Sequence, residues 1–134
     1  MISHHAALIY TMVLVSAADR DMTDAEMRSI GDIVLHLPVF RDFDRDNLTK
    51  AASACAEKLG GDGGLDQVLD EIKAALPQKL RETAYALACD VAAADCKVTQ
   101  EEARMLEMIR HELAIGRLPA AAIERGAKAR HTRL

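Results

Sequence analysis

The order of apolar and polar residues along the chain predicts helices and no strands. From residue 6 to residue 18 nearly every position is apolar, and only Thr11 and Ser16 interrupt the run. A helix that is apolar on all sides belongs in the middle of a bundle. The following segment, from Thr23 to Leu37, instead carries one apolar stripe at helical spacing and ends before Pro38. A buried helix followed by an amphipathic one is therefore expected at the start of the chain.

Similar stripes predict four more helices near residues 48–59, 65–76, 80–91 and 99–113, and a short basic helix follows Pro119. The glycine-rich run at residues 60–64 separates two of them. No Lys-Ser or Lys-Thr pair follows this run, so it is not a phosphate-binding loop, and we interpret it as a flexible connector. The predicted fold is all-α: a compact bundle of about seven helices in a single domain that covers residues 1–134.

The chain also contains an internal repeat with an offset of 76 residues. Residues 15–37 and 91–113 share nine identities in 23 positions without a gap, among them Thr23 with Thr99 and Glu26 with Glu102. The repeated unit is a buried helix, an acidic turn and an amphipathic helix. We therefore predict a duplicated helix-turn-helix, with one copy at residues 4–37 and the other at residues 79–113.

Two strings carry a resemblance to a known family. AADRDMTDAE and AYALACDVAAADCKVTQEEARMLEMIRHEL resemble the two hairpins of the TerB family of tellurite-resistance proteins. A related domain occurs beside J-domains in certain bacterial co-chaperones. The resemblance implies an all-helical bacterial fold linked to tellurite and metal-stress loci, with acidic residues proposed to bind a divalent metal. It also implies an accessory or scaffold role, in some members near membrane partners, and no settled enzymatic activity.

The chain departs from the family pattern directly after each turn aspartate. The family has glycine at this position, and this chain has Arg20 in the first copy and Cys96 in the second. If the position requires a positive φ, each replacement costs about 1 kcal/mol. The departure puts direct transfer of a family metal site in doubt.

The acidic turns are the candidate site for a divalent cation, Ca²⁺ or Mg²⁺. These hard cations prefer clustered carboxylate and carbonyl oxygens. The candidate ligands are Asp19, Asp21 and Glu26 in the first copy and Asp95 and Glu102 in the second. The first turn starts like an EF-hand loop but lacks its glycine and its final glutamate, so it is not an EF-hand.

A structural explanation of the same residues stands beside the metal hypothesis. The pairs Thr23 with Glu26 and Thr99 with Glu102 have the spacing of capping boxes, in which both side chains satisfy free backbone N–H groups at a helix start. Two functions therefore remain open. One is a non-enzymatic binding module of the stress response that holds a cation, and the other is a metal-free scaffold for protein–protein interaction.

Other chemistry has weaker support in the sequence. The histidines are scattered, and His4 and His5 lie where the first helix is expected to fray, so no zinc site is predicted. Asp90 lies near the core stripe of its helix, and we expect an arginine or lysine of a neighbouring helix to pair with it, with a ligand role as the alternative. No nucleophile and base can be placed together, so the protein is not predicted to be an enzyme.

Composition and charge limit the classes of partner that the protein is expected to bind. The formal net charge is −4, although residues 117–134 alone carry about +4, and no aromatic residues alternate with the basic ones. Nucleic acid is therefore not expected as a partner.

The apolar run at residues 6–18 is shorter than the roughly 20 residues needed to span a bilayer. Cys55, Cys89 and Cys96 are expected as free thiols in the cytoplasm. A protein is the expected partner, and a homo-oligomer is compatible with the sequence.

Overall fold

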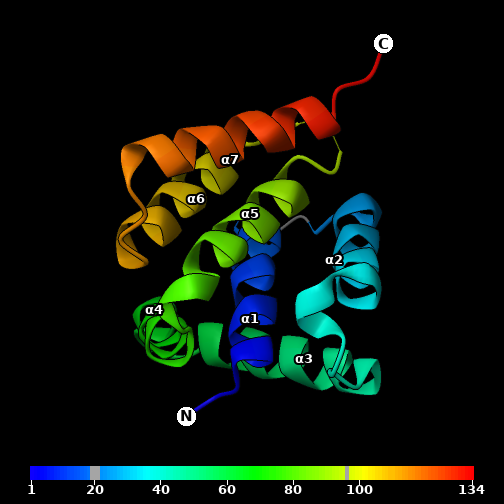
Figure 1. Cartoon of the computed structure of the whole chain (residues 1–134). Coiled ribbons are helices and arrows are strands. Elements are labelled where there is room, and N and C mark those ends of the chain that lie inside the picture. The colour runs from blue at the N-terminus through cyan, green and yellow to red at the C-terminus, as the bar shows by residue number, and fades with distance from the viewer. Residues whose placement is uncertain (19–21, 96) are drawn as a thin grey trace.

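The computed structural model is a bundle of helices and describes residues 1–18, 22–95 and 97–134 (Figure 1). No strand occurs in these residues, which confirms the predicted all-α fold. The α-helices are α1 (His4–Ala17), α2 (Asp24–His36), α3 (Leu48–Leu59), α4 (Gly64–Ala75), α5 (Arg81–Ala92), α6 (Gln100–Glu112) and α7 (Arg117–Arg130). Three short 3₁₀ helices lie between them: η1 (Pro38–Phe40), η2 (Arg45–Asn47) and η3 (Gln78–Leu80).

Helix α1 forms the centre of the bundle, as its apolar sequence predicts. It contacts α2, α3, α4, α5 and α6, and its longest contact is with α5 (Figure 1). Every residue from Ala7 to Ser16 is buried. The buried hydroxyl of Thr11 donates to the carbonyl oxygen of Ala7 at 2.8 Å, so this polar group is satisfied within the helix. Because each buried leucine or isoleucine contributes about 1.5–3 kcal/mol, α1 supplies much of the driving force for folding.

The start of α1 packs against a distant segment, whereas the sequence analysis expected it to fray. The ring of His5 is 8% exposed and lies against Phe40 and Phe43, with centroid distances of 5.6 and 5.1 Å. Its Nε2 lies 2.9 Å from the carbonyl oxygen of Val39 and 3.1 Å from Asp42 Oδ1. These partners come from a segment more than thirty residues away, and local sequence gives no sign of them.

The glycine-rich run forms a tight hydrogen-bonded turn between α3 and α4 and is not a loose connector. Gly63 has a φ of +65°, a conformation that glycine adopts without a steric penalty. Gly64 lies so close to the end of α3 that a Cβ atom there would be 2.2 Å from the carbonyl oxygen of Lys58. The two glycines therefore allow α4 to start directly against the last turn of α3.

Helices α6 and α7 are joined by a sharp turn at Ala114. The N–H of Ile115 donates to the carbonyl oxygen of Arg110 at 3.0 Å, and the N–H of Ala114 donates to that of His111 at 3.1 Å. This hydrogen-bond pair is the Schellman motif, which usually has glycine at its left-handed position. Here Ala114 occupies that position with a φ of +55°. The motif ends α6 and reverses the chain into α7.

Helix α7 begins before Pro119, where the sequence analysis placed its start after that residue. Arg117 is its first residue, and Pro119 lies within its first turn, where a proline needs no N–H donor. The helix packs along α5, whereas α6 and α7 come close to each other at very few positions. This leaves the two helices as opposite walls of a groove, which is described below.

Candidate functional site

The two predicted capping boxes are both present. The N–H of Thr23 donates to Glu26 Oε1 and the N–H of Glu26 donates to the Thr23 hydroxyl oxygen, each at 3.1 Å. Thr99 and Glu102 repeat this arrangement at the start of α6 with the same distances. Both glutamates are only 1% exposed. In both boxes the carboxylate therefore serves the helix start through Oε1.

The remaining predicted metal ligands are Asp19, Asp21 and Asp95. Asp95 Oδ1 accepts a hydrogen bond from the N–H of Lys97 at 3.1 Å, so it stabilises the turn that leads to α6. Asp19 and Asp21 lie outside the described residues, as do Arg20 and Cys96, the two residues that replace the family glycine. The expected backbone cost at those two positions therefore stays a prediction.

The described part of the chain contains no group of three or more histidine, cysteine, aspartate or glutamate side chains arranged to hold a metal ion. Divalent cations in proteins need several oxygen ligands at once. In the second turn Asp95 and Glu102 are described and Cys96 is not, so a cation at this turn stays a prediction. A cation at the first turn depends on Asp19 and Asp21, and it stays a prediction.

Asp90 has the partner that its sequence position predicts. Arg130, in the last turn of α7, places Nη2 2.6 Å from Asp90 Oδ1, and His131 Nε2 lies 3.5 Å from the same oxygen. The Asp90 side chain is 21% exposed, so it is a partly buried charge with an opposite charge beside it. The pair attaches the end of α7 to α5 and explains Asp90 without a ligand role.

Cys55 and Cys89 are free thiols, in agreement with the prediction for these two residues. Burial raises the pKa of each thiol to about 12. Because the thiolate is the reactive form, both side chains are suited to packing and not to thiol chemistry.

The structure brings together a site that the sequence analysis did not identify, the α6–α7 groove. It consists of two adjoining pockets of about 440 Å³ each that share Leu106 and Glu124. Helix α5 forms the floor through Tyr85 and Cys89. The walls are formed by facing residues of α6 and α7, chiefly Ala103, Leu106, Arg110, Ala120, Glu124 and Ala127.

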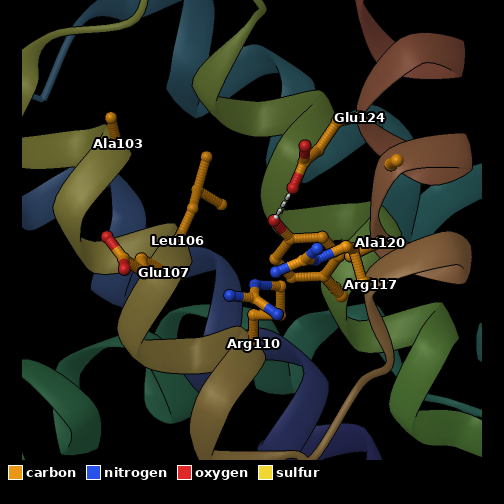
Figure 2. Close-up of a pocket in the computed structure, with 9 residues that line it drawn as sticks. Ala103, Leu106, Glu107, Arg110, Arg117, Ala120 and Glu124 are labelled. Carbon is orange, nitrogen blue, oxygen red and sulfur yellow. Dashed lines mark hydrogen bonds between the residues drawn. The ribbon is translucent and has the colours of Figure 1, made fainter.

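The two pockets of the groove differ in character. The first contains charged side chains: Arg110 and Arg117 lie at the same end of it, and the Glu107 carboxylate is turned away from both (Figure 2). The second is lined mainly by apolar side chains of α5, α6 and α7, with Lys128 and His131 beside them. The groove therefore offers an apolar surface that ends in positive charge.

The floor of the first pocket is held by a hydrogen bond between helices. Tyr85 donates its hydroxyl proton to Glu124 Oε2 at 2.5 Å (Figure 2, dashed line). Burial, together with this carboxylate, raises the pKa of the Tyr85 hydroxyl well above its ordinary value of 10.0. Tyr85 is therefore a neutral donor at physiological pH, and Glu124 is the acceptor.

Sequence reasoning missed this site because its residues carry no motif. The alanines that form the walls have the same spacing as alanines that pack in a core. One available signal was the polar face of the predicted sixth helix, where Glu107 and Arg110 lie beside Leu106. The depth of the groove depends on the distance between α6 and α7, and the residue pattern within either helix does not predict that distance.

The described residues form no helix that is both long and apolar enough to cross a membrane. Comparison with known families gives one match: the model for tellurite resistance protein TerB aligns with residues 5–125. No curated protein and no solved structure matches the chain. The family match covers the two predicted hairpins from residue 5 on, together with α5, α6 and the first part of α7 up to residue 125.

Proposed function

Because the chain belongs to the TerB family, we propose that it is a non-catalytic binding module of the response to tellurite and metal stress. Family membership supports the link to tellurite resistance. The observation that carries the binding role is the α6–α7 groove, where two pockets of about 440 Å³ adjoin between helices that barely contact each other. A concave, mainly apolar surface with a few charged groups is the usual form of a recognition site.

The partner in this proposal is a protein. The groove is walled on both sides by helices, which suits the insertion of side chains from another polypeptide. Small alanine side chains line both walls, so a partner can approach closely. Val98, which is 50% exposed, extends the apolar surface at one end.

The binding role can be tested with substitutions that fill the groove and leave the fold intact. Ala103 and Ala121 are exposed residues on opposite walls, and Ala103→Trp or Ala121→Trp would occupy the first pocket. Ala56→Trp, at an exposed position of α3, is the matched control. In the organism that encodes the protein, each variant replaces the natural copy, and growth is measured on tellurite. We expect both groove variants to lose resistance and the control to keep it, with unchanged melting temperatures. Equal resistance of all three would refute a role for the groove.

A divalent cation, Ca²⁺ or Mg²⁺, belongs to this proposal only at the first acidic turn. The carboxylates of Glu26 and Glu102 are used as caps, and the described residues contain no complete ligand set. Asp19 and Asp21 are then the ligands to test. The alternative is that both turns act only as caps and that the module works without a metal.

Thermal melting separates these two versions. Chelator-treated protein is melted with added Ca²⁺, Mg²⁺, Mn²⁺ or Zn²⁺, beside Asp19→Asn and Asp21→Asn, with Asp95→Asn as the control in the second turn. A cation that binds only the folded state raises the free energy of unfolding, and the gain grows with the logarithm of the cation concentration above its Kd. A rise of several degrees with one ion that disappears in Asp19→Asn or Asp21→Asn, but not in Asp95→Asn, supports the cation. No rise with any ion supports the metal-free module.

A further inference from the structure

The two arginines at one end of the α6–α7 groove form no ion pair with the two carboxylates, Glu107 and Glu124, that line the same pocket. Arg110 and Arg117 line the same pocket from opposite walls, and neither forms an ion pair with a described carboxylate. The hydrogen-bond partner found for Arg110 is the ring of His111, at 3.5 Å. Two other cations of the bundle form short ion pairs, Lys58 with Glu71 at 2.7 Å and Arg130 with Asp90 at 2.6 Å.

The carboxylates nearest to these arginines are directed elsewhere. Glu124 accepts the hydrogen bond of the Tyr85 hydroxyl, and Glu107 Oε1 lies 3.9 Å from His111 Nε2. Two guanidinium groups that face one pocket repel each other in the absence of an anion. A carboxylate between them would gain charge-assisted hydrogen bonds from both sides. The pocket is therefore complementary to a carboxylate.

The rest of the groove is complementary to an apolar helix. Its second pocket is formed mainly by Ala92, Val98, Leu106 and Ala127. Helix α7 has 14 residues, so at 1.5 Å per residue the wall that it forms is about 20 Å long. A helix of about four turns, with apolar residues at i, i+3 or i+4, and i+7, covers this length along a groove.

From this geometry we propose that the α6–α7 groove binds an amphipathic helix of a partner protein, with an acidic residue of that helix held between Arg110 and Arg117. The inference rests on the proposed binding role and adds the chemistry of the partner. The apolar face of the helix lies over Leu106 and the alanines of both walls. The acidic residue lies at the end where α6 turns into α7 and fixes the direction of the bound helix.

A peptide fits the rim of the groove better than a hydrocarbon chain does. Acidic and basic side chains both line the groove: Glu107 and Glu124 share the first pocket with the two arginines, and Lys128 lines the second. A lipid tail offers no hydrogen bonds to these groups and would desolvate them without compensation. An amphipathic helix presents apolar side chains to the floor and polar side chains to both rims.

Selection of displayed peptides tests this proposal with the full chain. The probe is a phage library of helix-forming peptides of about four turns, and bound peptides are sequenced and measured by fluorescence polarisation. We expect enriched sequences to combine an apolar stripe at helical spacing with Asp or Glu at one end. Ala103→Trp should abolish their binding, and Ala56→Trp should leave it unchanged.

The arginines are tested by a double-mutant cycle. Arg110→Gln combined with Arg117→Gln should weaken binding about tenfold, and replacing the acidic peptide residue by its amide should do the same. When the arginine variant is combined with the amide peptide, the fold-loss of affinity should be much smaller than the product of the two separate fold-losses. Arg125→Gln, on the exposed surface of α7, is the matched control and should leave the affinity unchanged.

Three results would overturn the proposal: no enrichment, enriched peptides without an acidic residue, or binding that is insensitive to the arginine variants. Oleate is the competing probe, and oleate binding that Ala103→Trp abolishes, without any enriched peptide, would assign the groove to acyl chains. The experiments distinguish a failure of this inference from a failure of the proposed function. If the tellurite test depends on the groove while no acidic helix binds, the binding role stands and the partner has other chemistry.

Discussion

The hydroxyl of Tyr85 in α5 donates a hydrogen bond to Glu124 of α7 over 2.5 Å. The contact has two consequences for the groove. It fixes the wall formed by α7 relative to the floor formed by α5. It also orients the Glu124 carboxylate toward the tyrosine, which leaves Arg117 of the same helix without that partner.

Replacing Tyr85 by phenylalanine should destabilise the protein by about 1.5 kcal/mol, because a hydrogen bond to a charged group is lost while the ring still packs. The measurement is urea unfolding of the wild type, Tyr85→Phe, Glu124→Gln and the double variant. The two changes should share most of their cost, since they remove the same contact. Fully additive costs would show that the hydrogen bond contributes nothing to stability.

Gly64→Ala should destabilise the protein by about 1–3 kcal/mol through overpacking. The added Cβ would be 2.2 Å from the carbonyl oxygen of Lys58, a backbone atom that cannot move without shifting the end of α3. Gly61→Ala is the control in the same turn, because its Cβ would lie at an ordinary 3.5 Å from the same oxygen. Thermal melting of both variants checks the contrast, and equal melting temperatures would contradict the close approach of α3 and α4.

Ala114→Gly should stabilise the protein by up to about 1 kcal/mol, because glycine removes the steric cost of the left-handed conformation. Alanine occupies that conformation here with a φ of +55°, at the Schellman turn between α6 and α7. The gain is reduced by the greater freedom of glycine in the unfolded chain. Urea unfolding measures the difference, and a destabilised Ala114→Gly variant would show that the strain at this turn is smaller than the entropic cost of glycine.

The ion pair between Lys58 and Glu71 should make stability depend on pH in the acid range. The Lys58 hydrogen bond lowers the pKa of Glu71 in the folded protein. As the pH falls below the ordinary glutamate value of 4.5, the unfolded chain therefore takes up a proton first, and the contribution of the pair is lost. We expect the wild type to lose about 1 kcal/mol more than Glu71→Gln between neutral and strongly acidic pH. Parallel curves of unfolding free energy against pH would contradict this assignment.

The parts of the fold that could be predicted from the sequence depend on neighbours along the chain. The continuous apolar run of α1 predicts its central place, and the spacing of Thr23 with Glu26 and of Thr99 with Glu102 predicts both capping boxes. The partner of Asp90 was predicted as a type, a basic residue from another helix, and the structure identifies it as Arg130. The internal duplication stays a prediction, although both copies start their second helix with the same cap.

The parts that could not be predicted depend on contacts between distant segments. His5 is held by Val39 and Asp42, and the glycine-rich run is compact because α4 approaches the end of α3. The groove arises because α7 packs on α5 and leaves α6 at a distance. Each of these features depends on how helices are placed relative to each other, which the periodicity within a single helix does not encode.

The burial of α1 on all sides also determines the order in which the chain can fold as it is made. Its longest contact is with α5, which ends at residue 92, whereas α1 itself ends at residue 17. At the usual rates of protein synthesis, the intervening residues take roughly 4 to 15 seconds to appear. During this time the most apolar segment of the protein lacks its main covering helix and depends on α3 and α4, or on a chaperone, to keep it from aggregating.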